Sequence, residues 1–413
     1  MKTILSVLLV MAFVSCSKKD RFAGDIEKWE LDAKTDSTIT INMKEHMVAQ
    51  KNLSEIICDV SYLELEATDG SYLTIPVNIK LTDSLIYVLD LDEHLRCFNR
   101  NGKFLRNGYK KGRGQGEVIS LYDFDVDKDY LYLLDGAKSA ILRYTHDGHF
   151  VDLCQLPFRA IRFKQMHNGW YLFALAPFTM TDKEENYSIV LTDSSFVVKK
   201  KYFSSLGIEK SIPVARTPYF ENSANSVYFA PIYQRSIYQL RDSILFMKYY
   251  LNFGTPYFEP SRNVNGEQEA QEKGILYTYG NPIHANDYLI QNFYTSREVK
   301  GLFLYDIQKD ESLFIKEVIN DMDNVIRFNF DLTKFYDVHQ NLFVGLTDVY
   351  FKGSHTEEEI KEGTSHLSDD AKSVLVRNEG LLFQVHPRAP VRFPPESLQY
   401  YLQLPESAQE KDQ

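Results

Sequence analysis

Residues 110–117, KKGRGQGE, contain the residue types of a phosphate-binding loop: three glycines at alternate positions, with basic side chains beside them. The dinucleotide fingerprint, however, is G-x-G-x-x-G at the start of a helix. Here Glu117 stands where that fingerprint has its last glycine, and strand-like sequence follows. We therefore predict a joint between two β elements, pinned by the Glu117 carboxylate, because glycine adopts positive φ at little steric cost. Arg113 and the lysines before it stay candidates for a cationic rim that binds an anionic ligand.

A second group of candidate ligand-binding residues has arginine close to aromatic side chains. Arg159, Arg162 and His167 lie in the segment 156–171, and Arg216 and Tyr219 follow in ARTPYF. A guanidinium beside aromatic rings suits a carboxylate, sulfate or sugar, through paired hydrogen bonds and stacking. The alternative is that these side chains only fill polar layers of the interior. We predict no catalytic residue, because the chain has neither G-x-S-x-G nor H-E-x-x-H.

Two clusters could bind a metal ion, and each has a simpler interpretation. His146 and His149 flank an Asp-Gly pair, which is a strong hairpin signal, so we expect two solvated imidazoles at a turn. In residues 123–129, DFDVDKD, aspartates alternate, which predicts one solvated strand face opposite packed Phe124 and Val126. We predict no metal site and no cofactor; calcium, which prefers oxygen ligands, is the alternative for the aspartates.

The N-terminus predicts export. Lys2, an apolar run over residues 4–14 and Ser15 resemble a secretory signal peptide. Residues 13–16, FVSC, resemble the lipobox of bacterial lipoproteins, with Phe13 in place of the usual leucine. We expect Cys16 to be the lipidated mature N-terminus, which anchors the protein in the cell envelope, on the outer membrane. Which face of that membrane carries the protein stays open.

Composition narrows the remaining options. The net charge of −11 and the pI of about 5.5 oppose nucleic-acid binding, which needs a basic face. Three cysteines remain after Cys16, namely Cys58, Cys97 and Cys154, and their spacing matches no zinc motif. An exported protein can form disulfides, so their pairing stays open, and buried free thiols are the simpler interpretation.

A repeat organises the elements that must position these residues. Residues 85–105 and 130–151 are alike and rich in strand-forming side chains, and each contains an Asn-Gly or Asp-Gly hairpin signal. A repeat of this length is typical of a propeller. The matched pairs are Tyr87/Tyr132 and Asp90/Asp135 at an offset of 45, and Phe98/Tyr144, Gly102/Gly148 and Phe104/Phe150 at an offset of 46. We expect the two aspartates to accept backbone N–H bonds in the turns that follow them.

Weaker copies bring the number of units to six. They start near residues 169, 226, 287 and 340, and two polar insertions at 261–274 and 354–372 should be surface excursions. We therefore predict an all-β fold: a six-bladed β-propeller of four-stranded antiparallel blades, closed by an N-terminal strand within residues 55–67. The expected divisions are a signal peptide (1–15), a lipidated tether and loosely held arm (16–52), the propeller (53–395) and a polar tail (396–413).

Five sequence features resemble the NHL-like six-bladed β-propeller lipoproteins of Gram-negative bacteria. They are residues 63–66 (LELE), 87–90 (YVLD), 101–104 (NGKF), 112–117 (GRGQGE) and 132–135 (YLLD). The close match covers about residues 55–155. The resemblance implies a fold and a location but no reaction, since this family is largely uncharacterised. We expect a membrane-anchored protein that binds a small molecule, glycan or protein partner without catalysis. The alternative is a propeller hydrolase or lyase with an ion-assisted site in the central channel.

Overall fold

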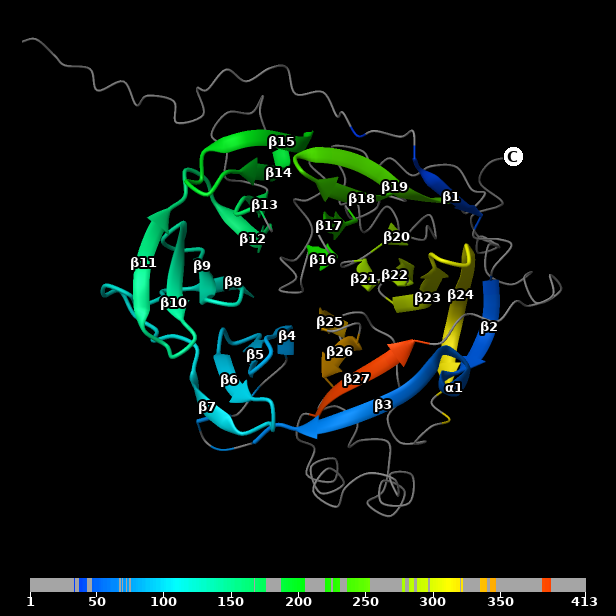
Figure 1. Ribbon diagram of the computed structural model, residues 1–413, viewed down its shortest axis with the longest axis horizontal. Coiled ribbons are helices and arrows are strands. Elements are labelled where there is room, and N and C mark those ends of the chain that lie inside the picture. The colour runs from blue at the N-terminus through cyan, green and yellow to red at the C-terminus, as the bar shows by residue number, and fades with distance from the viewer. Residues whose placement is uncertain are drawn as a thin grey trace, which may run out of the picture.

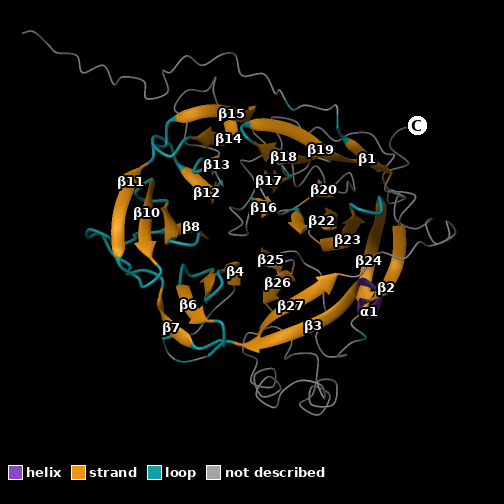
Figure 2. Ribbon diagram, in the orientation of Figure 1, coloured by secondary structure: helices purple, strands orange, loops and turns teal. Residues whose placement is uncertain are grey.

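In a computed structural model of the 413-residue chain, the described elements are β-strands apart from one short helix, α1 (Leu53–Ile56) (Figure 2). No helix among the described residues is long and apolar enough to cross a membrane. The structure describes residues 37–42, 47–66, 76–166, 168–175, 187–204, 220–223, 226–230, 236–252, 277–278, 282–285, 288–295, 298–319, 335–339, 342–346 and 381–387. It also describes the single positions 33, 68, 70, 71, 73 and 321.

The described strands form six sheets around a common centre, as expected for an all-β propeller with four-stranded antiparallel blades (Figure 1). Sheet 1 contains β4 (Pro76–Leu81), β5 (Leu85–Asp90), β6 (Leu95–Asn99) and β7 (Phe104–Asn107). Sheet 2 contains β8 (Leu121–Val126), β9 (Tyr130–Asp135), β10 (Ala140–Thr145) and β11 (Phe150–Gln155). Sheet 3 contains β12 (Ala160–Gln165), β13 (Tyr171–Leu175), β14 (Tyr187–Thr192) and β15 (Val198–Ser204). In each sheet the first strand lies nearest the centre.

The remaining three sheets also include strands from the N-terminal segment. Sheet 4 contains β16 (Glu221–Ser223), β17 (Ser226–Phe229), β18 (Ser236–Arg241), β19 (Ile244–Asn252) and β1 (Ile39–Asn42). Sheet 5 contains β20 (Tyr277–Thr278), β21 (Ile283–Ala285), β22 (Tyr288–Thr295), β23 (Glu298–Asp306), β24 (Glu311–Ile319) and β2 (Met47–Asn52). Sheet 6 contains β25 (Phe335–His339), β26 (Leu342–Leu346), β27 (Leu381–Pro387) and β3 (Ile57–Glu64).

The repeat seen in the sequence corresponds to sheets 1 and 2. Gly102 and Gly148 sit in the hairpin turns before β7 and β11, with φ of 78° and 88°, so the predicted hairpins are confirmed. The turn prediction for the matched aspartates is confirmed as well. Asp90 accepts a bond from His94 N at 2.8 Å, and Asp135 accepts bonds from the N–H groups of residues 137 and 138 at 3.0 Å each.

Apolar layers between neighbouring sheets form the core. One layer joins Tyr87 and Leu89 of sheet 1 to Phe124 and Leu133 of sheet 2. Comparable layers follow between sheets 2 and 3, 3 and 4, and 4 and 5, while Leu65, just after β3, packs on β-strand residues of sheet 1. Burying one face of each sheet on its neighbour is what makes a radial arrangement stable.

The N-terminal segment is held more closely than its polar composition suggests. β1 and β2 run parallel to the outermost strands β19 and β24, and β3 pairs antiparallel with β27. Ile41 is only 5% exposed and belongs to the layer between sheets 4 and 5. Strands of four to six residues whose partners lie some 200 residues away leave a weak local pattern, so the sequence indicated only a loose arm. The signal peptide, the two polar insertions and the tail lie outside the described residues.

Candidate functional site

The innermost strands of sheets 1–3 carry charged and polar side chains at equivalent positions. In β4, β8 and β12 the third and fifth residues are polar, and the fourth is apolar. All six polar side chains are buried, with exposed fractions of 2–6%: Asn78, Lys80, Asp123, Asp125, Arg162 and Lys164. Burying charges is unfavourable unless they are paired or hydrogen-bonded, so their contacts decide what this wall can do.

Asp123 links three sheets. Its Oδ1 accepts a hydrogen bond from Asn78 Nδ2 at 3.1 Å, and its Oδ2 accepts one from Phe163 N at 3.0 Å. Burial raises the pKa of the Asp123 carboxyl to about 6, although the nearby Arg162 guanidinium favours the charged form. Asn78 Oδ1 is buried without a hydrogen-bond partner. The Asp123 carboxylate thus accepts one hydrogen bond from sheet 1 and one from sheet 3, but burial keeps it from water.

Asp125 repeats this arrangement two residues along β8. Lys164 Nζ lies 3.0 Å from Asp125 Oδ1, and Gln165 N donates to Asp125 Oδ2 at 3.1 Å. β12 is the inner edge of its sheet, and it pairs only with β13. Edge strands present unpaired N–H groups. The two β8 carboxylates bind two such groups of β12, so they join the inner strands of neighbouring sheets.

The prediction of a solvated aspartate face is therefore wrong for Asp123 and Asp125. β8 lies between β4 and β12, so the face that would meet water in a flat sheet meets the neighbouring inner strands instead. Asp127 accepts bonds from the N–H groups of residues 129 and 130, and Asp129 is exposed. The described residues contain no group of three or more His, Cys, Asp or Glu side chains placed to hold a metal ion. The buried Asp123 and Asp125 carboxylates already accept hydrogen bonds from backbone N–H groups and from the Lys164 ammonium group.

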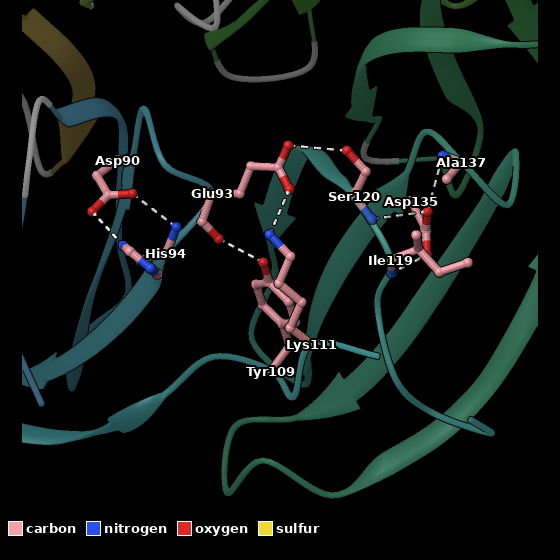
Figure 3. Close-up of polar contacts among 9 residues, drawn as sticks. All are labelled: Asp90, Glu93, His94, Tyr109, Lys111, Ile119, Ser120, Asp135 and Ala137. Carbon is pink, nitrogen blue, oxygen red and sulfur yellow. Dashed lines mark hydrogen bonds and ion pairs between the residues drawn. The ribbon is translucent and has the colours of Figure 1, made fainter. Parts of the chain in front are cut away.

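The loop between β7 and β8 is held by a second polar network (Figure 3). The Glu93 side chain accepts a bond from Ser120 Oγ at 3.0 Å and pairs with Lys111 Nζ at 3.5 Å. Tyr109 donates its hydroxyl to the Glu93 backbone oxygen, and Ile119 N donates to Asp135 Oδ2 at 2.8 Å. The turns after β5 and β9 thus fix both ends of the loop.

Glu117 closes the glycine-rich part of that loop, as the sequence predicted. Its Oε2 accepts a bond from Gly114 N at 2.8 Å, and its Oε1 lies 2.6 Å from Lys110 Nζ. These contacts hold the pKa of the Glu117 carboxyl below its ordinary value. A Cβ at position 112 would lie 2.1 Å from Glu117 Oε2, so the carboxylate can enter the loop only because that residue is glycine.

We expect Gly116→Ala to destabilise the protein by about 2–4 kcal/mol. Gly116 has φ of 69°, which L-residues rarely adopt, and an added Cβ would lie 2.7 Å from the Phe150 ring. Chemical denaturation would measure the loss. Gly114→Ala is the matched control, because only the movable Glu117 side chain faces its Cβ. Equal losses for both variants would contradict this account.

His146 is placed differently from the prediction of a solvated imidazole. Its Nδ1 lies 2.9 Å from the Tyr87 hydroxyl, and its Nε2 lies 2.9 Å from the Asp127 backbone oxygen. A neutral ring with the proton on Nε2 satisfies both contacts, because the carbonyl can only accept. His146 therefore joins sheets 1 and 2, whereas His149 is exposed at the turn.

The candidate ligand-binding residues have separate environments. Arg113 and Arg159 are exposed on loops, whereas Arg162 is buried in the inner wall and donates to the backbone oxygens of residues 122 and 161. His167, Arg216 and Tyr219 lie outside the described residues. Sequence reasoning missed Asn78 and Lys80; the signal was their position in the repeat, 45 residues before Asp123 and Asp125. Cys97 and Cys154 are free thiols.

A ring of radial sheets with a polar inner wall defines the class, an all-β propeller. The chain belongs to the family described as "Domain of unknown function (DUF4934)", whose model matches residues 38–376. That match begins next to β1 and therefore includes the arm strands.

One solved structure supports the fold, and two others show weaker similarity. A presumed exported protein from Bacteroides fragilis is similar with a TM-score of 0.65 and 19% identity, covering 83% of this chain and 100% of its own. A DUF4221 member from Bacteroides vulgatus has a TM-score of 0.45 and 9% identity, covering 80% of this chain and 97% of its own. Virginiamycin B lyase from Staphylococcus aureus has a TM-score of 0.33 and 13% identity, covering 65% of this chain and 76% of its own. No curated protein matches the chain significantly.

Proposed function

We propose that the protein is a lipid-anchored binding protein of the bacterial cell envelope. In this proposal the six sheets act as six blades, β3 closes the ring by pairing with β27, and Cys16 carries the lipid on the outer membrane. The residues that resemble a signal peptide, the lipobox-like residues and the structural similarity to a presumed exported protein from Bacteroides fragilis support this location. Binding requires no cofactor, metal ion or nucleic acid.

The binding surface is the pinned loop between β7 and β8, and one observation carries this choice. The loop is fixed by hydrogen bonds from both sides, yet the side chains of Lys110 and Lys111 are 81% and 64% exposed, and Arg113 is also exposed. A rigid loop loses little conformational entropy on binding. The ligand chemistry that fits is an anionic group, for which a guanidinium offers paired donors.

The inner wall is structural in this proposal. Asp123 and Asp125 bind backbone N–H groups of β12, and Lys164 is paired with Asp125. A general acid or base would need a carboxylate available to substrate. These contacts favour a binding role over the hydrolase or lyase alternative.

The test is binding of anionic probes to the purified protein, measured by calorimetry with an acidic oligosaccharide, a glutamate-rich peptide and inorganic phosphate. We expect one probe class to bind. Arg113→Glu should lower the affinity for that probe about tenfold or more, because it removes one charge-assisted hydrogen bond. Lys128→Glu is the control, since Lys128 is 88% exposed at the turn after β8. Binding that is unchanged by Arg113→Glu, or no binding by any probe, would refute the proposed surface.

A further inference from the structure

We propose that one end of sheets 1 and 2 docks on an anionic lipid surface, where Leu91 enters the headgroup layer and the basic side chains beside it contact lipid phosphates. This inference rests on the proposed function, because it uses the same cationic loop and the same lipid anchor. It adds the partner of that loop and the face of the ring that meets the membrane.

Four segments of the chain meet at this end of the two sheets. They are the turns 91–94 and 136–139 and the connections 108–120 and 156–159. The polar network around Glu93 and Asp135 joins the first connection to both turns (Figure 3). The second connection follows on directly, because Leu156 N donates to the Ser139 backbone oxygen at 2.8 Å. The four segments therefore form one continuous, hydrogen-bonded surface.

The exposed charges of this surface are mainly positive. The exposed basic side chains are Lys110, Lys111, Arg113 and Arg159, and the one exposed carboxylate in the four segments is that of Asp92. The two carboxylates that pair with the lysines are partly buried. Because a guanidinium presents paired donors to a phosphate, Arg113 and Arg159 are the side chains best suited to lipid contacts.

The opposite end of sheets 1 and 2 has the reverse balance of charge. Its hairpin turns expose two ammonium groups and three carboxylates, those of Lys103, Lys128, Asp83, Asp129 and Asp147. The chain as a whole has a net charge of −11. An anionic surface would therefore repel most of the protein and attract the end that carries the arginines, over a distance of about 10 Å at about 0.1 M salt.

Leu91 gives the cationic end an apolar contact. It lies in the turn after β5 and is 45% exposed, whereas Leu89, two residues earlier, is fully buried. The turn is fixed, because Asp90 accepts a bond from His94 N at 2.8 Å. A leucine held beside cationic side chains fits the boundary between headgroups and acyl chains. A soluble phosphate would gain nothing from it, so Leu91 favours a lipid.

The proposed anchor favours a lipid surface over an acidic glycan or protein as the partner. A lipid on Cys16 would keep the ring beside a membrane, so weak contacts would act at a high effective concentration. Each Lys or Arg near an anionic lipid surface adds a modest attraction. Several such contacts can orient a protein that is already tethered.

The environment of residue 91 tests the inference. The lipidated protein with Leu91→Cys, Cys58→Ser and Cys154→Ser is labelled with nitrobenzoxadiazole at position 91, because Cys97 is fully buried. We expect the emission to be several-fold higher on vesicles of equal parts phosphatidylglycerol and phosphatidylcholine than on phosphatidylcholine alone. Raising the salt from about 0.1 M to about 1 M should remove the difference.

Two variants with the same change in net charge separate the position of the charges from their sum. Arg113→Glu combined with Arg159→Glu should return the emission to its value on phosphatidylcholine, while the lysines that pin the loop stay in place. Lys103→Glu combined with Lys128→Glu, at the opposite end, should leave the emission unchanged.

Three outcomes would overturn the inference. In the first, the emission is the same on both vesicle compositions. In the second, the arginine variant leaves the emission on anionic vesicles unchanged, so that the basic side chains do not hold this end. In the third, the lysine variant lowers the emission as much as the arginine variant, so that only the net charge matters.

Failure of this inference can be told apart from failure of the proposed function. If an acidic glycan or peptide binds through Arg113 in calorimetry while the emission is the same on both vesicles, the binding function stands and the lipid is not its partner. If no probe binds and the protein does not float with phosphatidylcholine vesicles, the binding surface and the anchor are both refuted.

Discussion

Asp123→Ala should reduce the free energy of unfolding by about 3–5 kcal/mol, as expected when one member of a buried charged cluster is removed. The change leaves Asn78 Nδ2 and Phe163 N without an acceptor. It also removes a negative charge that interacts with the buried Arg162 guanidinium. Urea denaturation at pH 7 would measure the loss. Because Asp123 connects sheets 1, 2 and 3, we expect a single cooperative transition at a lower midpoint.

Asp123→Asn is the matched control, and it should cost much less than Asp123→Ala. Its amide oxygen can still accept from Phe163 N, while its NH₂ can donate to Asn78 Oδ1 if the Asn78 amide rotates. That oxygen is buried without a partner in the native cluster, so the rotation satisfies it. If Asp123→Asn were as destabilising as Asp123→Ala, the negative charge rather than the hydrogen bonds would hold the cluster together.

A comparison of the native protein with Asp123→Asn measures how the Asp123 carboxyl makes the free energy of unfolding depend on pH. The folded pKa of Asp123 is raised from 3.8 to about 6, so the folded state retains this proton after the unfolded chain has lost it. The contribution of Asp123 to stability therefore falls as pH rises from about 4 to about 6, by on the order of 3 kcal/mol, and is constant above. Relative to Asp123→Asn, the native protein should be most stable near pH 4. A difference that rises with pH would contradict the raised pKa.

The sequence predicted local features well because they depend on neighbouring residues. The offsets that match Tyr87 with Tyr132 and Asp90 with Asp135 correspond to equivalent strands and turns in sheets 1 and 2. The glycine-rich segment around Glu117 is the predicted joint between β7 and β8. In each case the hydrogen bonds that explain the pattern join residues close in sequence, such as Asp90 with His94 and Glu117 with Gly114.

Burial at the centre of the ring could not be predicted in the same way. Alternation placed Asp123 and Asp125 on one face of β8, but whether that face meets water depends on β4 and β12, which other units supply. The same reason explains Arg162. Its segment was predicted to bind a ligand or to fill a polar layer, and only the fold shows that its guanidinium donates to the backbone oxygens of residues 122 and 161. Likewise, only the fold reveals that His146 reaches Tyr87 of the preceding sheet.

Lys164→Met should be as destabilising as the loss of Asp123, by about 3–5 kcal/mol. Lys164 and Asp125 have side chains only 8% and 4% exposed, and their 3.0 Å contact is the ion pair between β12 and β8. Methionine conserves most of the side-chain volume, so the loss comes mainly from leaving the Asp125 carboxylate buried with a single remaining donor, Gln165 N. Equilibrium denaturation at pH 7 would measure it.

Two further variants separate the buried charge from packing. Adding Asp125→Asn to Lys164→Met removes the uncompensated charge but keeps an oxygen for Gln165 N, so the double variant should be more stable than Lys164→Met alone. The exposed pair of Lys128 and Asp129, 3.8 Å apart with side chains 88% and 58% exposed, is the control. Lys128→Met should change stability by less than about 0.5 kcal/mol. If the double variant were instead less stable than Lys164→Met, the methionine would be disrupting packing at β12, and the ion pair would not be what joins the two inner strands.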